Sequence, residues 1–399
     1  MDILEAKKAV IEAGERLVES GLIARTWGNV SCRVDDKTFV ITPSGKPYIG
    51  LTPEDIVEVA IEDLAWSGDV KPSSEKGIHA EVYKEYPDAN FVIHTHQKIA
   101  SVVSAFRTGI DTVSGEAEKV IGKNVLLGGY GLPGTGKLKK GVTKALRLSP
   151  SKAVIMAHHG ALCFGADSSE AFEVASCLEM LCAEYILKGA KDRLGIVAES
   201  LDDFCAQIVK KLVKNDASVE VDKSELYDSS CDRENNRIIL VNKETGKEVM
   251  MALSNGTAND AVSETAEAHR KIYISNESFN YIIHNADKET VAVSLLGKTM
   301  KPLLDDFSQI CGTKVRVACK ASKCGKAIKG RNAVLLKGKG ALCCGSVKGD
   351  AEAVDMIMSK SCLTLLGTKV YESAKPINPV EALLMRVIYL KKYSKQASE

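Results

Sequence analysis

The sequence has no stretch of roughly 18 or more consecutive apolar residues, which is about the length that a membrane-spanning helix requires. Its first 21 residues form an amphipathic helical pattern with acids and lysines, and they do not contain the unbroken apolar core of a secretory signal peptide. We therefore expect a cytoplasmic protein that has no membrane partner.

An excess of charge of one sign is also missing. The 53 basic and 52 acidic residues are mixed along the 399-residue chain and give a formal net charge of +1, so nothing indicates a nucleic-acid partner. The chain has 12 cysteines but no C-x-x-C pair, and several of them lie within apolar runs, such as Cys177, Cys182 and Cys362. We expect these cysteines to be reduced and mostly buried thiols.

A nucleotide-binding P-loop is nearly present, but two of its requirements are not met. Gly131, Gly136 and Lys137 have the spacing of that motif, yet Leu138 stands where a magnesium-binding Ser or Thr is needed. The apolar run before it, residues 125–127, is also shorter than the buried strand that a P-loop follows. The segment must have another role.

The chain does contain an internal repeat. Residues 91–104, FVIHTHQKIASVVS, resemble residues 281–294, YIIHNADKETVAVS, and residues 158–165, HHGALCFG, resemble residues 338–345, GKGALCCG. A pair of histidines recurs with the same spacing of 15 residues in each copy: His79 with His94, and His269 with His284. The sequence therefore predicts a tandem duplication of one αβ unit.

The boundary between the copies is expected in the polar, aperiodic stretch 214–236, which follows helix-patterned sequence. We predict one domain over residues 1–215 and a second over residues 225–399. In the first domain short β-branched runs alternate with amphipathic helical stretches. This alternation predicts a layered α/β domain in each half.

Three histidines of the first half are possible metal ligands. His94 and His96 are two residues apart on a strand-like run, so their side chains point to the same face of the sheet, and His159 ends another strand-like run before a glycine. Three imidazoles are a ligand set of open zinc sites. The alternative is that these histidines are satisfied by ordinary hydrogen bonds at the ends of strands.

Glu75 is the acid to consider beside them. In the segment KPSSEKGIH it could be only a first-turn acid of a capped helix, where the macrodipole favours carboxylates. At a zinc site it could instead be a general base, with Ser73 and Ser74 donating hydrogen bonds to an anion at the start of the helix.

Together these motifs resemble the class II aldolase/adducin family, and most closely its L-fuculose-phosphate aldolase branch. The resemblance covers nearly all of residues 1–190 and is weak in the second half. It implies two tandem αβα layered domains, each with a central, largely antiparallel sheet. The motifs that carry it are TWGNVSCR (26–33), ITPSG (41–45), PSSE (72–75), HTH (94–96), YGLPGTG (130–136) and HHG (158–160).

The resemblance also assigns roles to individual residues. It places the zinc ligands at His94, His96 and His159, with His158 as the alternative for the third ligand. It makes Glu75 the catalytic acid/base and Tyr130 a proton donor near a neighbouring subunit's metal. The implied phosphate pocket consists of hydroxyls, amides and backbone N–H groups: Thr26, Asn29, Ser44, Gly45, Ser73 and Ser74.

The activity implied is that of a zinc-dependent lyase, with one Zn²⁺ per chain, that cleaves a sugar phosphate by retro-aldol chemistry through a metal-stabilised enediolate. A related epimerase or dehydratase, or a non-catalytic adducin-like binding or scaffold protein, is the alternative. The family also implies fourfold rings, so that a dimer of two-domain chains would form a pseudo-fourfold ring.

The second copy departs from the family pattern. His284, Asn285 and Ala286 stand opposite the HTH motif, and Gly338 and Lys339 stand opposite the two histidines of HHG. One of three ligands is left. We predict that this domain holds no zinc and has a structural or interface role.

Overall fold

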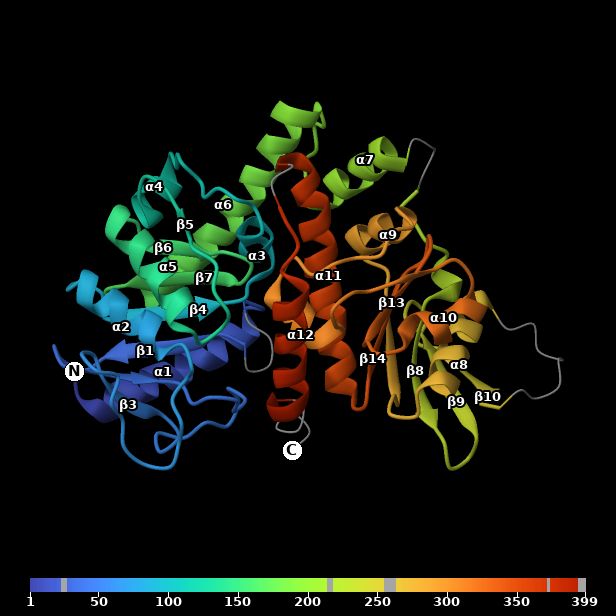
Figure 1. Cartoon of the computed structure of the whole chain (residues 1–399), viewed down its shortest axis with the longest axis horizontal. Helices are drawn as coiled ribbons and strands as arrows, with labels where there is room; N and C mark the ends of the chain where they lie inside the picture. The colour runs from blue at the N-terminus through green and yellow to red at the C-terminus, as the bar shows by residue number, and fades with distance from the viewer. Residues whose placement is uncertain (23–26, 214–217, 255–262, 372–373, 394–399) are drawn as a thin grey trace. The chain divides into compact units, whose positions relative to one another are not determined.

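The structure is a computed structural model that describes residues 1–22, 27–213, 218–254, 263–371 and 374–393. Its elements are drawn in Figure 1. The chain divides into two compact units, Met1–Lys188 and Gly189–Glu399. The division lies inside helix α6 (Ser168–Leu194), upstream of the predicted linker. The predicted domain bounds, 1–215 and 225–399, stay a prediction.

The predicted linker contains regular structure at its C-terminal end. A 3-10 turn, η1 (Lys223–Glu225), leads into strand β8 (Tyr227–Asp232), which belongs to the second sheet. The polar sequence there hides a strand because only one of its residues, Ser229, is buried. Periodicity of apolar residues therefore gave no signal.

The first unit is built on a seven-stranded sheet of order β3-β2-β1-β4-β7-β6-β5. Neighbouring strands are antiparallel except β5 and β6, which are parallel. The expected largely antiparallel sheet is confirmed. Its strands are β1 (Asn29–Arg33), β2 (Thr38–Ile41), β3 (Val57–Ala60), β4 (Phe91–Thr95), β5 (Leu126–Gly128), β6 (Ala153–Met156) and β7 (Gly160–Gly165).

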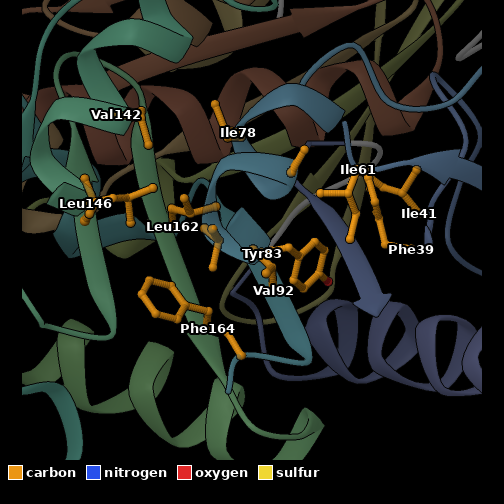
Figure 2. Close-up of a cluster of buried hydrophobic side chains, with 14 of the residues drawn as sticks. Phe39, Ile41, Ile61, Ile78, Tyr83, Val92, Val142, Leu146, Leu162 and Phe164 are labelled. Carbon is orange, nitrogen blue, oxygen red and sulfur yellow. The ribbon is translucent and has the colours of Figure 1, made fainter. Parts of the chain in front are cut away.

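Helices cover both faces of this sheet. Helices α2 (Lys76–Glu85) and α5 (Gly136–Leu148) pack together on one face, and α1 (Ile3–Glu19) and α3 (Lys98–Ser104) contact strands from the other; a short helix, α4 (Glu116–Ile121), precedes β5. Figure 2 shows the buried cluster between the sheet and the α2–α5 layer. It includes Phe39, Ile41, Ile61, Ile78, Tyr83, Val92, Val142, Leu146, Leu162 and Phe164.

The P-loop-like segment is a turn that starts a helix. The hydroxyl of Thr135 accepts from the Leu138 N–H and caps the N-terminus of α5. Gly134 takes a positive φ of 71°, and a Cβ on Gly131 would lie 2.3 Å from the Leu138 nitrogen. The glycines are therefore required by the tight turn onto α5.

The second unit repeats this architecture. Its sheet has the order β10-β9-β8-β11-β14-β13-β12, with one parallel pair, β12 and β13, at the corresponding edge. Helices α8 and α10 pack on one face, and α9 and α11 contact strands from the other. The remaining strands are β9 (Arg237–Asn242), β10 (Glu248–Ala252), β11 (Tyr281–Asn285), β12 (Val317–Ala318), β13 (Ala333–Leu336) and β14 (Gly340–Gly345).

Two topologically equal sheets establish the αβα duplication that the sequence predicts. The other elements of the second unit are α7 (Leu201–Val213), α8 (Glu264–Ser275), α9 (Lys288–Leu295), the π-helix η2 (Phe307–Cys311), α10 (Ala321–Ile328), α11 (Lys348–Tyr371), α12 (Pro379–Ile388) and the π-helix η3 (Tyr389–Tyr393). Within the described residues, no helix has the length and apolar character needed to span a bilayer. All 12 cysteines are free thiols, and most are buried, as expected.

Candidate metal and acid/base site

His94 lies in the middle of the first sheet. It stands on β4 with Asn29 of β1 opposite on one side and Leu162 of β7 opposite on the other, and its side chain is fully buried. Its Nδ1 lies 2.8 Å from the carbonyl oxygen of Ala161. Because a carbonyl only accepts, Nδ1 carries the proton and Nε2 presents a lone pair.

His159 lies in the turn between β6 and β7, and its side chain lies beside that of His94. The turn needs glycine at position 160, since a Cβ there would lie 2.2 Å from the backbone oxygen of Thr95. His158 has a positive φ of 60°, and the group of histidines able to share a metal contains His159 and not His158. Between the two alternatives, the geometry favours His159.

The three imidazoles have the spacing of metal ligands. Nε2 of His94 lies 3.1 Å from Nε2 of His96 and 3.2 Å from Nε2 of His159. Nitrogens bound to one tetrahedral zinc at about 2.0–2.1 Å lie roughly 3.3 Å apart. The donor set therefore fits a zinc ion in both ligand type and separation.

Glu75 faces this group rather than its own helix. It occupies the N-cap position of α2, but its side chain makes no capping hydrogen bond. Its two carboxylate oxygens lie 3.1 Å from Nε2 of His94 and 3.1 Å from Nε2 of His159. The geometry thus places Glu75 within reach of a metal held by the histidines, and not in the helix-capping role that its sequence context allows.

A cation would complete the charge balance around Glu75. Burial raises the pKa of Glu75, but the charges of His159 and His94 and their hydrogen bonds outweigh it and hold the pKa well below its usual range. Nε2 of His94 and the carboxylate oxygen are both acceptors when Nδ1 is the protonated nitrogen. Their contact is favourable only if a second proton or a metal ion lies between them.

Four of the residues predicted to bind phosphate, Ser44, Gly45, Ser73 and Ser74, lie in two loops, and Asn29 lies on β1. An antiparallel bridge between Pro43 and Pro72 joins the two loops, and the N–H groups of Ser44 and Ser73 donate from one loop to the other, to the oxygens of Lys71 and Thr42. Their hydroxyls, rather than these two amides, are therefore the groups left to meet an anion. Gly45 takes a positive φ of 77°, Ser74 is exposed, and Thr26 lies outside the described residues.

Tyr130 follows β5. Its ring and the His158 ring are nearly perpendicular, with 5.3 Å between centroids, and Lys137 Nζ lies over the Tyr130 ring, 5.6 Å from its centroid. Its predicted role at a neighbouring subunit's metal depends on an assembly, so that role stays a prediction.

The geometry agrees with the chain's similarity to known proteins. The family described as Class II Aldolase and Adducin N-terminal domain matches residues 8–186 and again residues 221–364. The chain belongs to this family. The double match also confirms the tandem duplication.

Several aldolases are similar to somewhat less than half of the chain. The 5-methylthioribulose-1-phosphate/5-deoxyribulose-1-phosphate aldolase of Rhodospirillum rubrum is 32% identical over 179 residues, 45% of this chain and 79% of that protein. The L-fuculose phosphate aldolase of Escherichia coli K12 is 31% identical over 179 residues, 45% of this chain and 81% of that protein. A solved L-fuculose 1-phosphate aldolase shares 30% identity over 49% of this chain and 89% of its own, with a TM-score of 0.44. The family match and these aldolase relatives support the expectation that the chain is a class II aldolase.

The second class II aldolase-like domain arranges its remaining histidine differently. Nε2 of His284 lies 2.6 Å from the carbonyl oxygen of Lys339, so this nitrogen carries a proton and cannot bind a metal. The Lys339 ammonium, at the position of the third ligand, forms an ion pair with Glu225. No set of three metal ligands lies wholly within the described part of this domain; the expected loss of zinc stays a prediction.

Sequence reasoning used His79 only as a mark of the repeat and assigned it no role at the site of the first class II aldolase domain. His79 is fully buried, with Nε2 2.5 Å from Asn29 Oδ1 and Nδ1 2.6 Å from the hydroxyl of Ser31. Burial and the charge of His94 lower its pKa to about 3, against the opposing effect of Glu75, so it is neutral. The 15-residue spacing to the next histidine, equal in both copies, was the signal that could have found it.

Proposed function

We propose that the chain is a zinc-dependent lyase that cleaves a sugar phosphate, with one Zn²⁺ held by His94, His96 and His159 of the first domain. The observation that carries the proposal is the cluster of three imidazoles, in which Nε2 of His94 lies 3.1 and 3.2 Å from those of His96 and His159, with the buried carboxylate of Glu75 in contact with His94 and His159. A scaffold protein has no physical need for such a buried group, which argues against the adducin-like alternative.

The chemistry follows from where these groups stand. A zinc ion, when bound, supplies Lewis-acid stabilisation of the negative charge that develops on the substrate oxygens as the carbon–carbon bond breaks. Glu75 is the acid/base group at hand: it would take up a proton from water and deliver it to the carbon of the ketose-phosphate fragment. Tyr130, as its phenolate, would take the proton of the hydroxyl that becomes the aldehyde and pass it on to water, so that no net proton is gained or lost.

The substrate class is proposed from the loops and the relatives. The similar aldolases are named for ketose phosphates with the phosphate on carbon 1, and a phosphate of this kind would be held by hydroxyls and amides rather than by a cationic clamp. The predicted pocket comprises Thr26, Asn29, Ser44, Gly45, Ser73 and Ser74.

The proposal is tested by product analysis. Purified protein is incubated with a series of ketose 1-phosphates, with and without a chelator, and the products are resolved by NMR. Release of an aldehyde and a three-carbon phosphate that stops on chelation supports the lyase. An epimerised or dehydrated product would instead indicate the related epimerase or dehydratase activity. If zinc-loaded protein turns over none of the ketose 1-phosphates, a binding role is favoured.

The second domain is proposed to complete the assembly. Since it keeps the sheet and loses the ligands, we assign it a structural or interface role. A dimer of chains that forms a pseudo-fourfold ring would put it beside a catalytic domain, where its surface could close the zinc site.

A further inference from the structure

A continuous row of hydrogen-bonded side chains runs from the core to Glu75. The hydroxyl of Tyr83 lies 2.7 Å from that of Ser31, which lies 2.6 Å from Nδ1 of His79. Nε2 of His79 lies 2.5 Å from Oδ1 of Asn29, and Nδ2 of Asn29 donates a long hydrogen bond of 3.4 Å to Oε2 of Glu75. All five side chains are buried.

The direction of each hydrogen bond is determined by the carboxylate. A carboxylate only accepts, so the amide NH₂ of Asn29, and not its oxygen, must face Glu75. The amide oxygen then faces His79, whose Nε2 must carry the ring's proton. Nδ1 is left as an acceptor for the Ser31 hydroxyl, and Tyr83 donates to Ser31. One tautomer of a neutral histidine thus fixes which way the amide points.

The second domain contains the inner half of this row without its outer half. The hydroxyl of Ser229 lies 2.7 Å from Nδ1 of His269 and 2.9 Å from the hydroxyl of Tyr273. The strand register places Tyr227 where the first domain has Asn29, and Nε2 of His269 has no hydrogen-bond partner among the described residues. The Tyr–Ser–His part therefore belongs to the fold, and Asn29 is what connects it to an acid.

We infer that His79 and Asn29 are positioning residues for Glu75, and that His79 acts by holding the Asn29 amide in the orientation that directs its NH₂ at the carboxylate. This inference rests on the proposed function, in which Glu75 moves the proton. A glutamate side chain has three rotatable bonds, and it needs a fixed partner to keep one oxygen toward the reacting carbon. Asn29 Nδ2 and the two imidazoles together supply that restraint.

The inference differs from the phosphate-binding role predicted for Asn29, and kinetics separates the two. Asn29→Leu removes both hydrogen bonds and keeps the number and branching of the side-chain heavy atoms. If Asn29 positions Glu75, kcat falls roughly tenfold to hundredfold, as expected for a misplaced catalytic group, while KM and the inhibition constant of inorganic phosphate stay within about twofold of wild type. A large rise in both constants with kcat unchanged would overturn the inference.

The role of His79 is tested by two amides of different length. Gln places its NH₂ near the position of Nε2 and can still donate to Asn29, whereas Asn mimics only the Nδ1 side. We expect His79→Gln to keep several-fold more kcat than His79→Asn. The matched control is His269→Asn in the second domain, the same substitution at a buried histidine whose Nε2 has no hydrogen-bond partner among the described residues, and we expect it to leave kcat unchanged. Equal kcat for both His79 variants, or an equal loss in the control, would contradict the inference.

Two measurements that do not depend on turnover keep this test separate from the test of the proposed function. Zinc content is measured in each variant and should stay at about one per chain, and crystals of zinc-loaded wild type and Asn29→Leu should show the Glu75 carboxylate displaced in the variant. If wild type has no lyase activity, the proposed function is wrong, yet the displacement still decides the positioning role. A carboxylate that keeps its wild-type position in Asn29→Leu would refute it.

Discussion

Acid should destabilise the second domain through its buried histidines, and His269 allows the effect to be measured. Burial, with a smaller contribution from the charge of His284, lowers the pKa of His269 from 6.5 to about 3. The folded domain therefore keeps this imidazole neutral at a pH where the unfolded chain protonates it. Its contribution to stability is fully present above about pH 6.5 and is lost progressively as the pH falls from there toward 3.

The magnitude follows from linkage. Each pH unit below 6.5 lowers the free energy of unfolding by about 1.4 kcal/mol per such histidine, so the loss between about pH 7.5 and pH 5 is about 2 kcal/mol. At pH 5 the folded residue is still neutral, so this value does not depend on how far below pH 5 the folded pKa lies. His284, whose pKa burial lowers to about 4, should contribute a similar loss.

One group in the same domain acts in the opposite direction. Burial raises the pKa of Asp355 from 3.8 to about 6, so its carboxyl takes up a proton more readily in the folded state and adds about 1.4 kcal/mol of stability as the pH falls to 5. The total change in the free energy of unfolding on acidification therefore contains contributions of both signs. A comparison of His269→Gln with wild type removes the shared contributions of Asp355 and His284.

The assay is hydrogen–deuterium exchange of peptides from α8 and β11 in a urea series, at about pH 7.5 and pH 5, corrected for the intrinsic exchange rate. We expect the variant to be less stable at pH 7.5, because Ser229 loses its partner, but to lose about 2 kcal/mol less than wild type on acidification. Identical losses in the two proteins would show that His269 titrates normally and would refute the reasoning.

Three further predictions concern the first domain and its partner. Purified protein should bind about one zinc per chain, and His94→Ala should lose both the metal and the activity; two zinc ions of equal affinity, by metal analysis, would contradict the loss of the second site. Glu75→Gln should lower kcat by about 10²- to 10⁴-fold with zinc retained, and unchanged turnover would remove Glu75 from the chemistry. Residues 1–215 expressed alone should be folded and zinc-loaded but inactive if the second domain completes the site; a fully active monomer, by light scattering and turnover, would argue against the proposed ring.

Much of the fold and part of the site are local properties that one sequence can display. Alternation along a strand places His94 and His96 on one side, and equal spacings along the chain reveal the duplication, because both depend only on the order of residues. The glycine after His159 is visible too, and its cause is steric: Thr95 leaves no room for a Cβ. Family, fold class and candidate ligands could therefore be predicted.

Convergence of distant residues was decided by tertiary packing. Glu75 looks like a helix-capping acid until α2 packs on the sheet and turns its carboxylate toward His94 and His159. The choice of His159 over His158 depends on the backbone of one turn.

The protonation pattern of the site was hidden for the same reason. Asn29 and Glu75 are 46 positions apart in sequence, and the amide of Asn29 is oriented by His79, 50 positions away. A linear sequence specifies which donors and acceptors exist, but which of them meet is settled only when β1, β4 and α2 are packed together. The sequence by itself determined the duplication, the fold class and the candidate ligands, and the tertiary structure decided which nitrogens of His94 and His79 face the site.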